Sequence, residues 1–299
     1  MHPGSDRISV VLRNVATPLP LAVLVMLLLP LLSPARLSAG SWPMQRRATY
    51  FSVGYRGFSG VEYFGRDGTR LGLHRLEEQT LAFSSEYGYS KYVSALVQLP
   101  AFRKLYAQTS ADAPLLSVQS PGDVDLGLRF TVWPGAQDAI SLTALFGIPL
   151  GESTQAAGLW AGDNEYNQLI QLRYGHAFDF LGTFVQLESG YNFRSGGYAD
   201  ELRVGGEVGF HPMDAVELKF QLHAVSSQGN GDPDFHGGSF GFASNNQRYV
   251  MFGPEASVWL TDGMGVSLGF LTITEARNMP AATLLTTGLF FLLTPRADR

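Results

Sequence analysis

The sequence predicts an all-β protein: a transmembrane antiparallel β-barrel of about 12 strands that follows a cleavable signal peptide. Three observations predict this fold. The amino terminus carries an export signal, apolar and polar residues alternate with a period of two, and the connections alternate between short and long. A chain of 299 residues could hold one or two domains, but β-barrels routinely use about 200–250 residues as one unit, so one domain is the simpler interpretation. We therefore expect a signal peptide at 1–39 and a barrel at 40–299.

The amino-terminal segment has the three regions of a secretory signal peptide. Arg7 and Arg13 precede an apolar run of 14 residues, Leu19–Leu32, and a stretch of mostly small residues ends at Ala39. A membrane-spanning helix needs about 20 apolar residues, so this run is short for an anchor. Cleavage near Ala39 leaves a mature chain with 18 basic and 25 acidic residues, a net charge of −7.

The composition favours a surface that is poor in charge. Only 16% of the residues are charged, against about 25% in soluble proteins, and 12% are aromatic. The absence of cysteine excludes disulfides and thiolate chemistry. The acidic balance argues against nucleic acid as a partner, because binding phosphates requires a basic face.

Alternation of apolar and polar residues recurs along the whole mature chain. It is clearest at 122–133, where Val124, Leu126, Leu128 and Phe130 alternate with polar residues or glycine. The same pattern predicts twelve strands, at 49–55, 79–88, 91–99, 122–133, 139–149, 165–178, 183–193, 201–211, 215–225, 247–260, 264–274 and 282–294.

The predicted connections alternate in length, which is typical of outer-membrane barrels with short periplasmic turns and long extracellular loops. Short turns are expected at 89–90, 134–138, 179–182, 212–214 and 261–263. Loops are expected at 56–78, 100–121, 150–164, 194–200, 226–246 and 275–281. An even strand number places both termini on the short-turn side, in agreement with an export signal that is removed in the periplasm.

A soluble β-sandwich or lipocalin-like barrel would also alternate, but its outer surface would carry about a quarter charged residues. We therefore place the chain in the outer membrane of a Gram-negative envelope, with outer-membrane lipid and the barrel assembly machinery as partners. Aromatic residues near strand ends are expected to form girdles at the two interfaces. They are Trp133, Phe178, Phe184, Tyr191, Phe193, Phe210 and Trp259.

Several short motifs resemble one family of outer-membrane proteins. They are Gly122–Phe130, Leu145–Gly151, Gly162–Glu165, Leu172–His176, Gly190–Gly197 and Asp200–Arg203. These segments are similar to the transporter family named for the meta-pathway of phenol degradation, and they cover roughly 120–212. The resemblance implies a monomeric barrel associated with the uptake of small, often aromatic, compounds. Pro149-Leu150-Gly151 departs from the commoner Pro-Thr-Gly, and the chain lacks a terminal aromatic residue.

If the apolar faces contact lipid, the opposite faces line the lumen and collect charges of both signs. The candidate pathway residues are Arg129, Arg173, Glu188, Arg203, Glu207, Glu217, Lys219 and His223. Twelve strands enclose a narrow or partly plugged interior, since about eight are filled by side chains and 16–18 leave a channel. These charges either select solutes at a constriction or pair across strands and fill the lumen.

The residues give little support to catalysis or cofactor binding. His223 and Ser226 are separated by three positions and so point to opposite faces of a strand, out of reach of each other. The histidines have no metal-ligand spacing, and no glycine loop of the phosphate-binding type occurs. We expect no enzyme activity, no cofactor and no metal.

The sequence therefore favours an outer-membrane, porin-like channel or facilitator for passive transport of a small solute. By the resemblance this solute would be aromatic or hydrophobic. The alternative is a structural or accessory barrel of an envelope or secretion complex that transports nothing.

Overall fold

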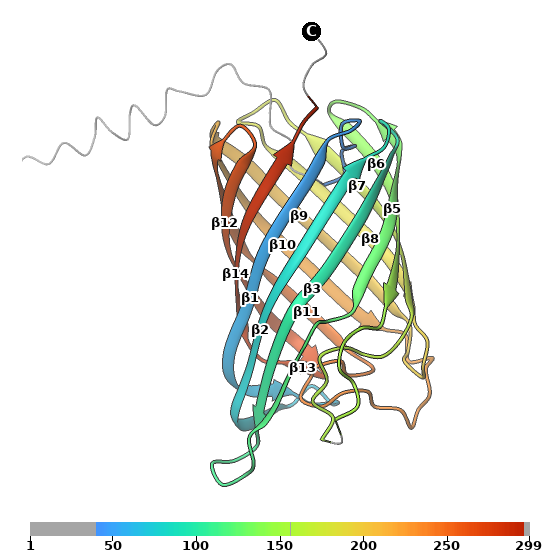
Figure 1. Ribbon diagram of the computed structural model, residues 1–299, viewed down its shortest axis with the longest axis vertical. Helices are drawn as coiled ribbons and strands as arrows, with labels where there is room; N and C mark the ends of the chain where they lie inside the picture. Colours follow the sequence, from blue (N-terminus) through green and yellow to red (C-terminus); the bar gives the residue numbers. More distant parts are fainter. Residues whose placement is uncertain (1–39, 156, 296–299) are drawn as a thin grey trace, which may run out of the picture. The chain divides into compact units, whose positions relative to one another are not determined.

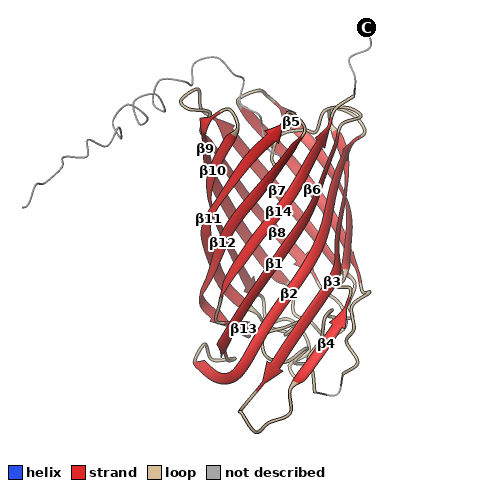
Figure 2. Ribbon diagram, turned by 60° about the vertical axis from the view of Figure 1, so that its left-hand side comes forward, coloured by secondary structure: helices blue, strands red, loops and turns tan. Residues whose placement is uncertain are grey.

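The computed structural model describes residues 40–155 and 157–295, so the predicted signal peptide lies outside the described residues. The described residues form a closed β-barrel of tilted strands (Figures 1 and 2). Among the described residues, no helix is long and apolar enough to span a membrane. The strands are β1 (Thr49–Phe64), β2 (Arg70–Gly88), β3 (Val93–Gln108), β4 (Leu116–Ser120), β5 (Val124–Pro134), β6 (Asp138–Ile148), β7 (Asn167–Ala177), β8 (Phe184–Phe193), β9 (Glu201–Met213), β10 (Val216–Ser227), β11 (Arg248–Thr261), β12 (Met264–Arg277), β13 (Met279–Pro280) and β14 (Thr283–Leu293).

Twelve of these strands close the barrel. Each pairs antiparallel with the next, and β1 closes the cylinder because it pairs with β14 on one side and β2 on the other. The short β4 pairs only with β3, and β13 only with β1. The predicted transmembrane antiparallel barrel of about 12 strands is confirmed.

The two ends of the barrel differ as the sequence predicted. The turn end carries five connections of two to six residues, between β2 and β3, β5 and β6, β7 and β8, β9 and β10, and β11 and β12. It also holds Thr49 and Leu293, the outer ends of the first and last strands. The loop end carries the longer connections, including those at 149–166 and 228–247. In outer-membrane barrels the turn end faces the periplasm.

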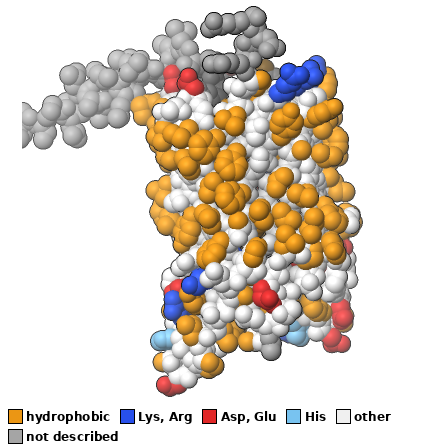
Figure 3. Space-filling view, viewed as in Figure 1, with side chains coloured by type: hydrophobic (Ala, Val, Ile, Leu, Met, Phe, Trp, Pro, Cys, Tyr) orange, Lys and Arg blue, Asp and Glu red, His pale blue; other side chains and the backbone are white. Residues whose placement is uncertain are grey.

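The alternation separates a lipid face from a lumen face. Along β5, Leu126, Leu128 and Phe130 are exposed on the outside, whereas Arg129 and Thr131 are buried inside. The same division holds along β7, where Ile170 and Leu172 face outward and Gln171 faces inward. On the face shown in Figure 3, hydrophobic side chains are consequently spread over the middle of the outer surface, and charged ones lie near the two ends.

The expected aromatic girdles need two corrections. Trp133, Phe178, Phe193 and Phe210 are exposed near strand ends, as predicted, and Tyr191 faces outward in the same row as Phe193. Phe184 is only 3% exposed, because it shares its face of β8 with the inward Gln186. Trp259 shares its face of β11 with Glu255 and packs edge-on against the buried Phe290 at 4.8 Å.

Two predicted loops were also wrong in part. Most of 56–78 belongs to extended β1 and β2, and much of 100–121 belongs to β3 and β4. At about 3.3 Å per residue, the 19 residues of β2 reach well beyond a bilayer that 9–11 residues cross. Outside the membrane the strands have no lipid face, so the alternation weakens there and the pattern fails to mark them.

Replacing Leu172 with arginine should destabilise the barrel, because this residue lies on the lipid face at the middle of β7 and is 53% exposed. An arginine at the bilayer midplane costs about 2–4 kcal/mol. The free energy of unfolding in lipid vesicles, measured with urea, checks this. Leu150→Arg in the loop at 149–166 is the control and should change it little; equal losses would contradict the assigned faces.

Candidate functional site

The inner surface of the barrel is the candidate functional site, and its charged half lies on β5 and β7–β11. All eight predicted pathway residues occupy inward-facing positions of these strands. We call this half the charged wall. Its partners include one residue of β2 that sequence reasoning missed, Glu86, which pairs with Arg129; Glu78 of β2, also missed, pairs instead with Arg56 of β1 and Arg103 of β3.

Lys219 is the centre of one group on the charged wall. Its ammonium nitrogen lies 3.1 Å from Glu255, 3.8 Å from Glu207 and 4.0 Å from Glu217. Glu217 is nearly fully buried and also lies 3.2 Å from His211 Nε2. One cation therefore sits among carboxylates from β9, β10 and β11, because the antiparallel register brings these positions side by side.

A second group crosses β2, β5, β7 and β8. Arg129, which is 2% exposed, lies 3.0 Å from Glu86. Glu188 lies 3.3 Å from Arg173 and 3.5 Å from His223 Nδ1. Arg203, nearer the loop end, donates two hydrogen bonds to Glu201. The sequence could identify these side chains from their parity, but their partners depend on strand register, which it does not specify.

At mid-barrel the opposite part of the inner surface is built from small and hydroxyl-bearing residues, although Arg56, Glu78 and Glu86 also face inward on β1 and β2. We call it the neutral wall, and it consists of Ser52, Gly54, Ser84, Ser267, Gly269, Thr286 and Gly288 on β1, β2, β12 and β14. Ser52 and Ser84 hydrogen-bond to each other at 2.6 Å. A β-carbon at Gly54 would meet nothing closer than the Thr287 carbonyl oxygen at 3.7 Å. The lumen is therefore open beside Gly54, whereas β-carbons at Gly269 and Gly288 of the same wall would each lie 2.8 Å from a neighbouring hydroxyl oxygen.

The charged wall is packed by its own long side chains. A β-carbon at Gly205 would lie 2.7 Å from Glu188 and 3.0 Å from His223, and one at Gly209 would overlap the Phe184 ring. Glycine at these positions makes room for the long side chains of neighbouring strands. A cavity of about 200 Å³ remains between Arg173, Glu188, Glu207, His223 and the segment at 40–41.

The segment at 40–44 folds into the lumen at the turn end (Figure 1). The Ser41 backbone N–H and hydroxyl both donate to Gln186 Oε1, at 2.5 and 2.9 Å. Trp42 is 6% exposed and packs edge-on against Phe184 at 6.3 Å. Sequence reasoning did not find this constriction, because 40–48 has no alternation to place it on either face.

An apolar cluster narrows the loop end. Residues of the extended strands, such as Phe58, Leu76 and Leu105, pack with Leu159 and Phe242 from the loops at 149–166 and 228–247. Phe58 and Phe242 stack with their rings 6.0 Å apart. The interior therefore has an apolar zone at the loop end and a polar zone at mid-barrel.

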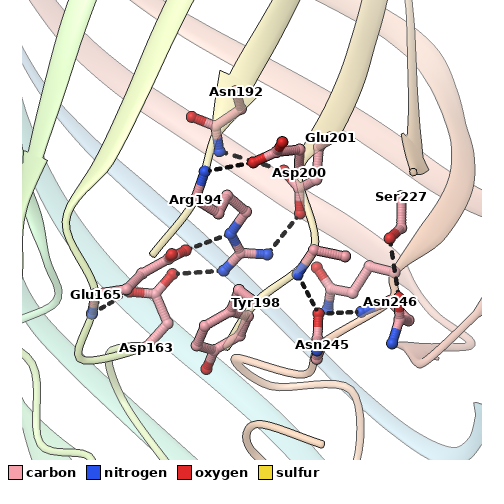
Figure 4. Close-up of polar contacts among 12 residues, drawn as sticks. Asp163, Glu165, Asn192, Arg194, Tyr198, Asp200, Glu201, Ser227, Asn245 and Asn246 are labelled. Atoms are coloured by element: carbon pink, nitrogen blue, oxygen red, sulfur yellow. Dashed lines mark hydrogen bonds and ion pairs between the residues drawn. The ribbon is translucent and has the colours of Figure 1, made fainter. Parts of the chain in front are cut away.

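Arg194 joins the loops of this end (Figure 4). Its guanidinium binds Asp163 at 2.9 Å, Glu165 by a short ion pair, and Glu201 at 2.7 Å. It also lies over the Tyr198 ring, whose hydroxyl donates to the Ala243 carbonyl. Arg194 thus joins the loop at 194–200 to the loop at 149–166, and Tyr198 joins it to the loop at 228–247.

Three carboxyl groups, those of Asp163, Glu165 and Glu201, share the single guanidinium group of Arg194. Burial raises the pKa of both Asp163 and Glu165, and repulsion between the neighbouring carboxylates adds to the effect on Asp163. Arg194 opposes the shift without cancelling it. Protonation of Asp163 therefore stabilises the joined loops.

Other candidate chemistry finds no geometric support. His223 faces the lumen, whereas Ser226 lies on the outward row of β10 opposite Arg248. Within residues 40–155 and 157–295, no group of three or more acidic, histidine or cysteine side chains could hold a metal ion.

The joined loops should open as the pH rises. A carboxyl whose folded pKa is raised contributes stability that is complete below its unfolded value, about 4, and declines as the pH rises toward the folded value. Hydrogen exchange of residues 150–166, corrected for intrinsic rates, should therefore speed up between about pH 5 and pH 9. Asp163→Asn should reduce this dependence and the exposed Asp112→Asn should keep it; protection that grows with pH would contradict the assignment.

No family model and no curated protein matches the sequence. The structure is similar to the COG4313 outer membrane channel from Pseudomonas putida F1, with a TM-score of 0.64 and 13% identity over 86% of this chain and 100% of that one. The KdgM porin (TM-score 0.47, 9% identity, 80% of this chain and 98% of that one) and the CymD monoaromatic hydrocarbon channel (0.39, 11%, 86% and 90%) are more distant. At these identities the likeness shows the fold alone, and the fold is that of an outer-membrane β-barrel.

Proposed function

We propose that the chain is an outer-membrane channel through which a small solute passes by diffusion. The observation that carries this proposal is the open part of the lumen beside Gly54. The charged wall is filled by its own side chains, whereas the neutral wall leaves space beside Gly54. A purely structural barrel gains nothing from a wall of small residues, because unfilled space forfeits packing contacts.

The pairing of charges supports an uncharged solute with apolar surface. The cations of the charged wall already have carboxylate neighbours, so a charged solute finds few groups free to replace its hydration. The apolar cluster at the loop end would favour an apolar body over a polar one. A small aromatic or hydrophobic compound is therefore the solute class that we propose, as the family resemblance also implies.

The neutral wall gives a direct test. Gly54→Phe should reduce single-channel conductance in planar bilayers by roughly half or more, because the ring would enter the open side of the lumen. The matched control is Val53→Phe, the adjacent residue on the lipid face, which should leave conductance unchanged. A folded barrel that conducts nothing before any substitution would favour the accessory role instead.

The charged wall should set ion selectivity if the pathway passes along it. Arg173→Glu places a carboxylate beside Glu188 and should shift the reversal potential toward cation selectivity. Lys91→Glu, in the exposed turn between β2 and β3, is the control with the same change of charge. Unchanged selectivity in a conducting variant would mean that the pathway avoids this wall.

A further inference from the structure

A basic cavity lies on the outside of the barrel at the loop end, away from the solute pathway. Its volume is about 420 Å³, within the range of small-ligand pockets. Three arginines line it, Arg66 from the turn between β1 and β2, Arg248 from the start of β11 and Arg277 from the end of β12. Segments distant in the sequence thus bring three positive charges to one hollow.

Without a bound anion, the arrangement of these arginines is electrostatically unfavourable. Arg248 and Arg277 are directly opposite each other on neighbouring antiparallel strands. Like charges at such positions repel and destabilise the sheet. Within the described part of the chain, none of the three guanidinium groups has a carboxylate oxygen within 4 Å, although most arginines of the barrel interior do.

Nearby carboxylates form no ion pair with these arginines among the described residues, including the exposed Glu275 two residues before Arg277. Asp67 lies close enough to Arg277 for an electrostatic interaction. Its carboxylate accepts hydrogen bonds from the backbone N–H and the hydroxyl of Thr69. Asp232 accepts the backbone N–H of Asp234 within its own turn. The positive charge of the cavity is therefore only weakly offset by the protein.

The remaining lining is polar and held in place. The side-chain nitrogen of Asn278 donates to the backbone carbonyls of Asn245 and Asn246, and its backbone N–H donates to the carbonyl of Gly65. The Ser227 hydroxyl donates to Asn246, which Figure 4 shows beside Asn245. These bonds fix the turn that carries Arg66 against the strand ends that carry the other two arginines.

The position of the cavity also bears on its ligand. Arg248 continues the outward row of β11 that includes the exposed Phe252, so its side chain lies just beyond the apolar belt. Lipid phosphate groups lie where the hydrocarbon of a membrane ends. Arginine binds phosphate through paired, charge-assisted hydrogen bonds.

We propose that this cavity binds a phosphate group, with Arg66, Arg248 and Arg277 as its ligands. The group belongs either to a phosphorylated lipid of the outer leaflet or to a soluble phosphate. Binding would relieve the repulsion between Arg248 and Arg277 and so stabilise the loop end. The site is independent of the lumen and of the proposed transport.

The test uses the purified full chain in nonionic detergent with diphosphoryl lipid A as the probe. The variant Arg248→Gln/Arg277→Gln should bind it about tenfold more weakly than the unmodified protein. The control is Arg70→Gln/Arg75→Gln, which removes equal charge at the same end from arginines already paired with Glu62 and Glu77. The control should bind as the unmodified protein does, and equal affinity for both variants would overturn the proposal.

Two further arms separate the sources and guard against misfolding. Competition by millimolar inorganic phosphate would identify a soluble phosphate as a sufficient ligand, whereas resistance to it would identify the lipid; dephosphorylated lipid A that binds equally well would overturn the site. Without any ligand, Arg248→Gln/Arg277→Gln should melt at a higher temperature than the unmodified protein, because the repulsion is gone. A lower melting temperature would show that these arginines are not in conflict.

Discussion

The structure depends on one constraint, that backbone polar groups in a hydrocarbon solvent must be paired within the protein. The pairing of β1 with both β14 and β2 meets it by leaving no edge. Once the sheet is closed, each strand has one face toward lipid and one toward the lumen. The two walls of the lumen, the aromatic girdles and the basic cavity all follow from which residue falls on which face.

The same constraint explains how much could be predicted from the sequence. Inside the bilayer a register shift of one residue would exchange the lipid-facing and lumen-facing side chains of a whole strand. The alternation is therefore strict there, and all twelve strands were located. Beyond the bilayer both faces of β1, β2 and β3 meet water or loops, and the pattern disappears there. Phe184 could have been placed correctly, since it shares its parity along β8 with Glu188, which was predicted to face the lumen.

The site was predictable as a set of residues but not as a set of contacts. Parity alone placed Lys219 and Glu207 in the lumen, yet only the register of β9, β10 and β11 makes Lys219 the shared partner of three carboxylates. The segment at 40–44 and the junction at Arg194 were out of reach for a different reason. They are irregular structure held by side-chain hydrogen bonds and ion pairs, which carry no periodic signal.

Arginines inside the barrel are paired with carboxylates, whereas Arg248 and Arg277 on the outside are not, among the described residues. Inside, an unpaired guanidinium would lose hydration with nothing in return, and Arg129 and Arg194 are accordingly held by carboxylates. On the outer rim water can hydrate an arginine, so Arg248 and Arg277 can face each other at a modest cost. A single carboxylate in place of Ser226, which lies opposite Arg248, would offset the charge of these arginines, as carboxylates do for the arginines inside the barrel. The serine at that position leaves the arginines open to an anion that the protein does not supply.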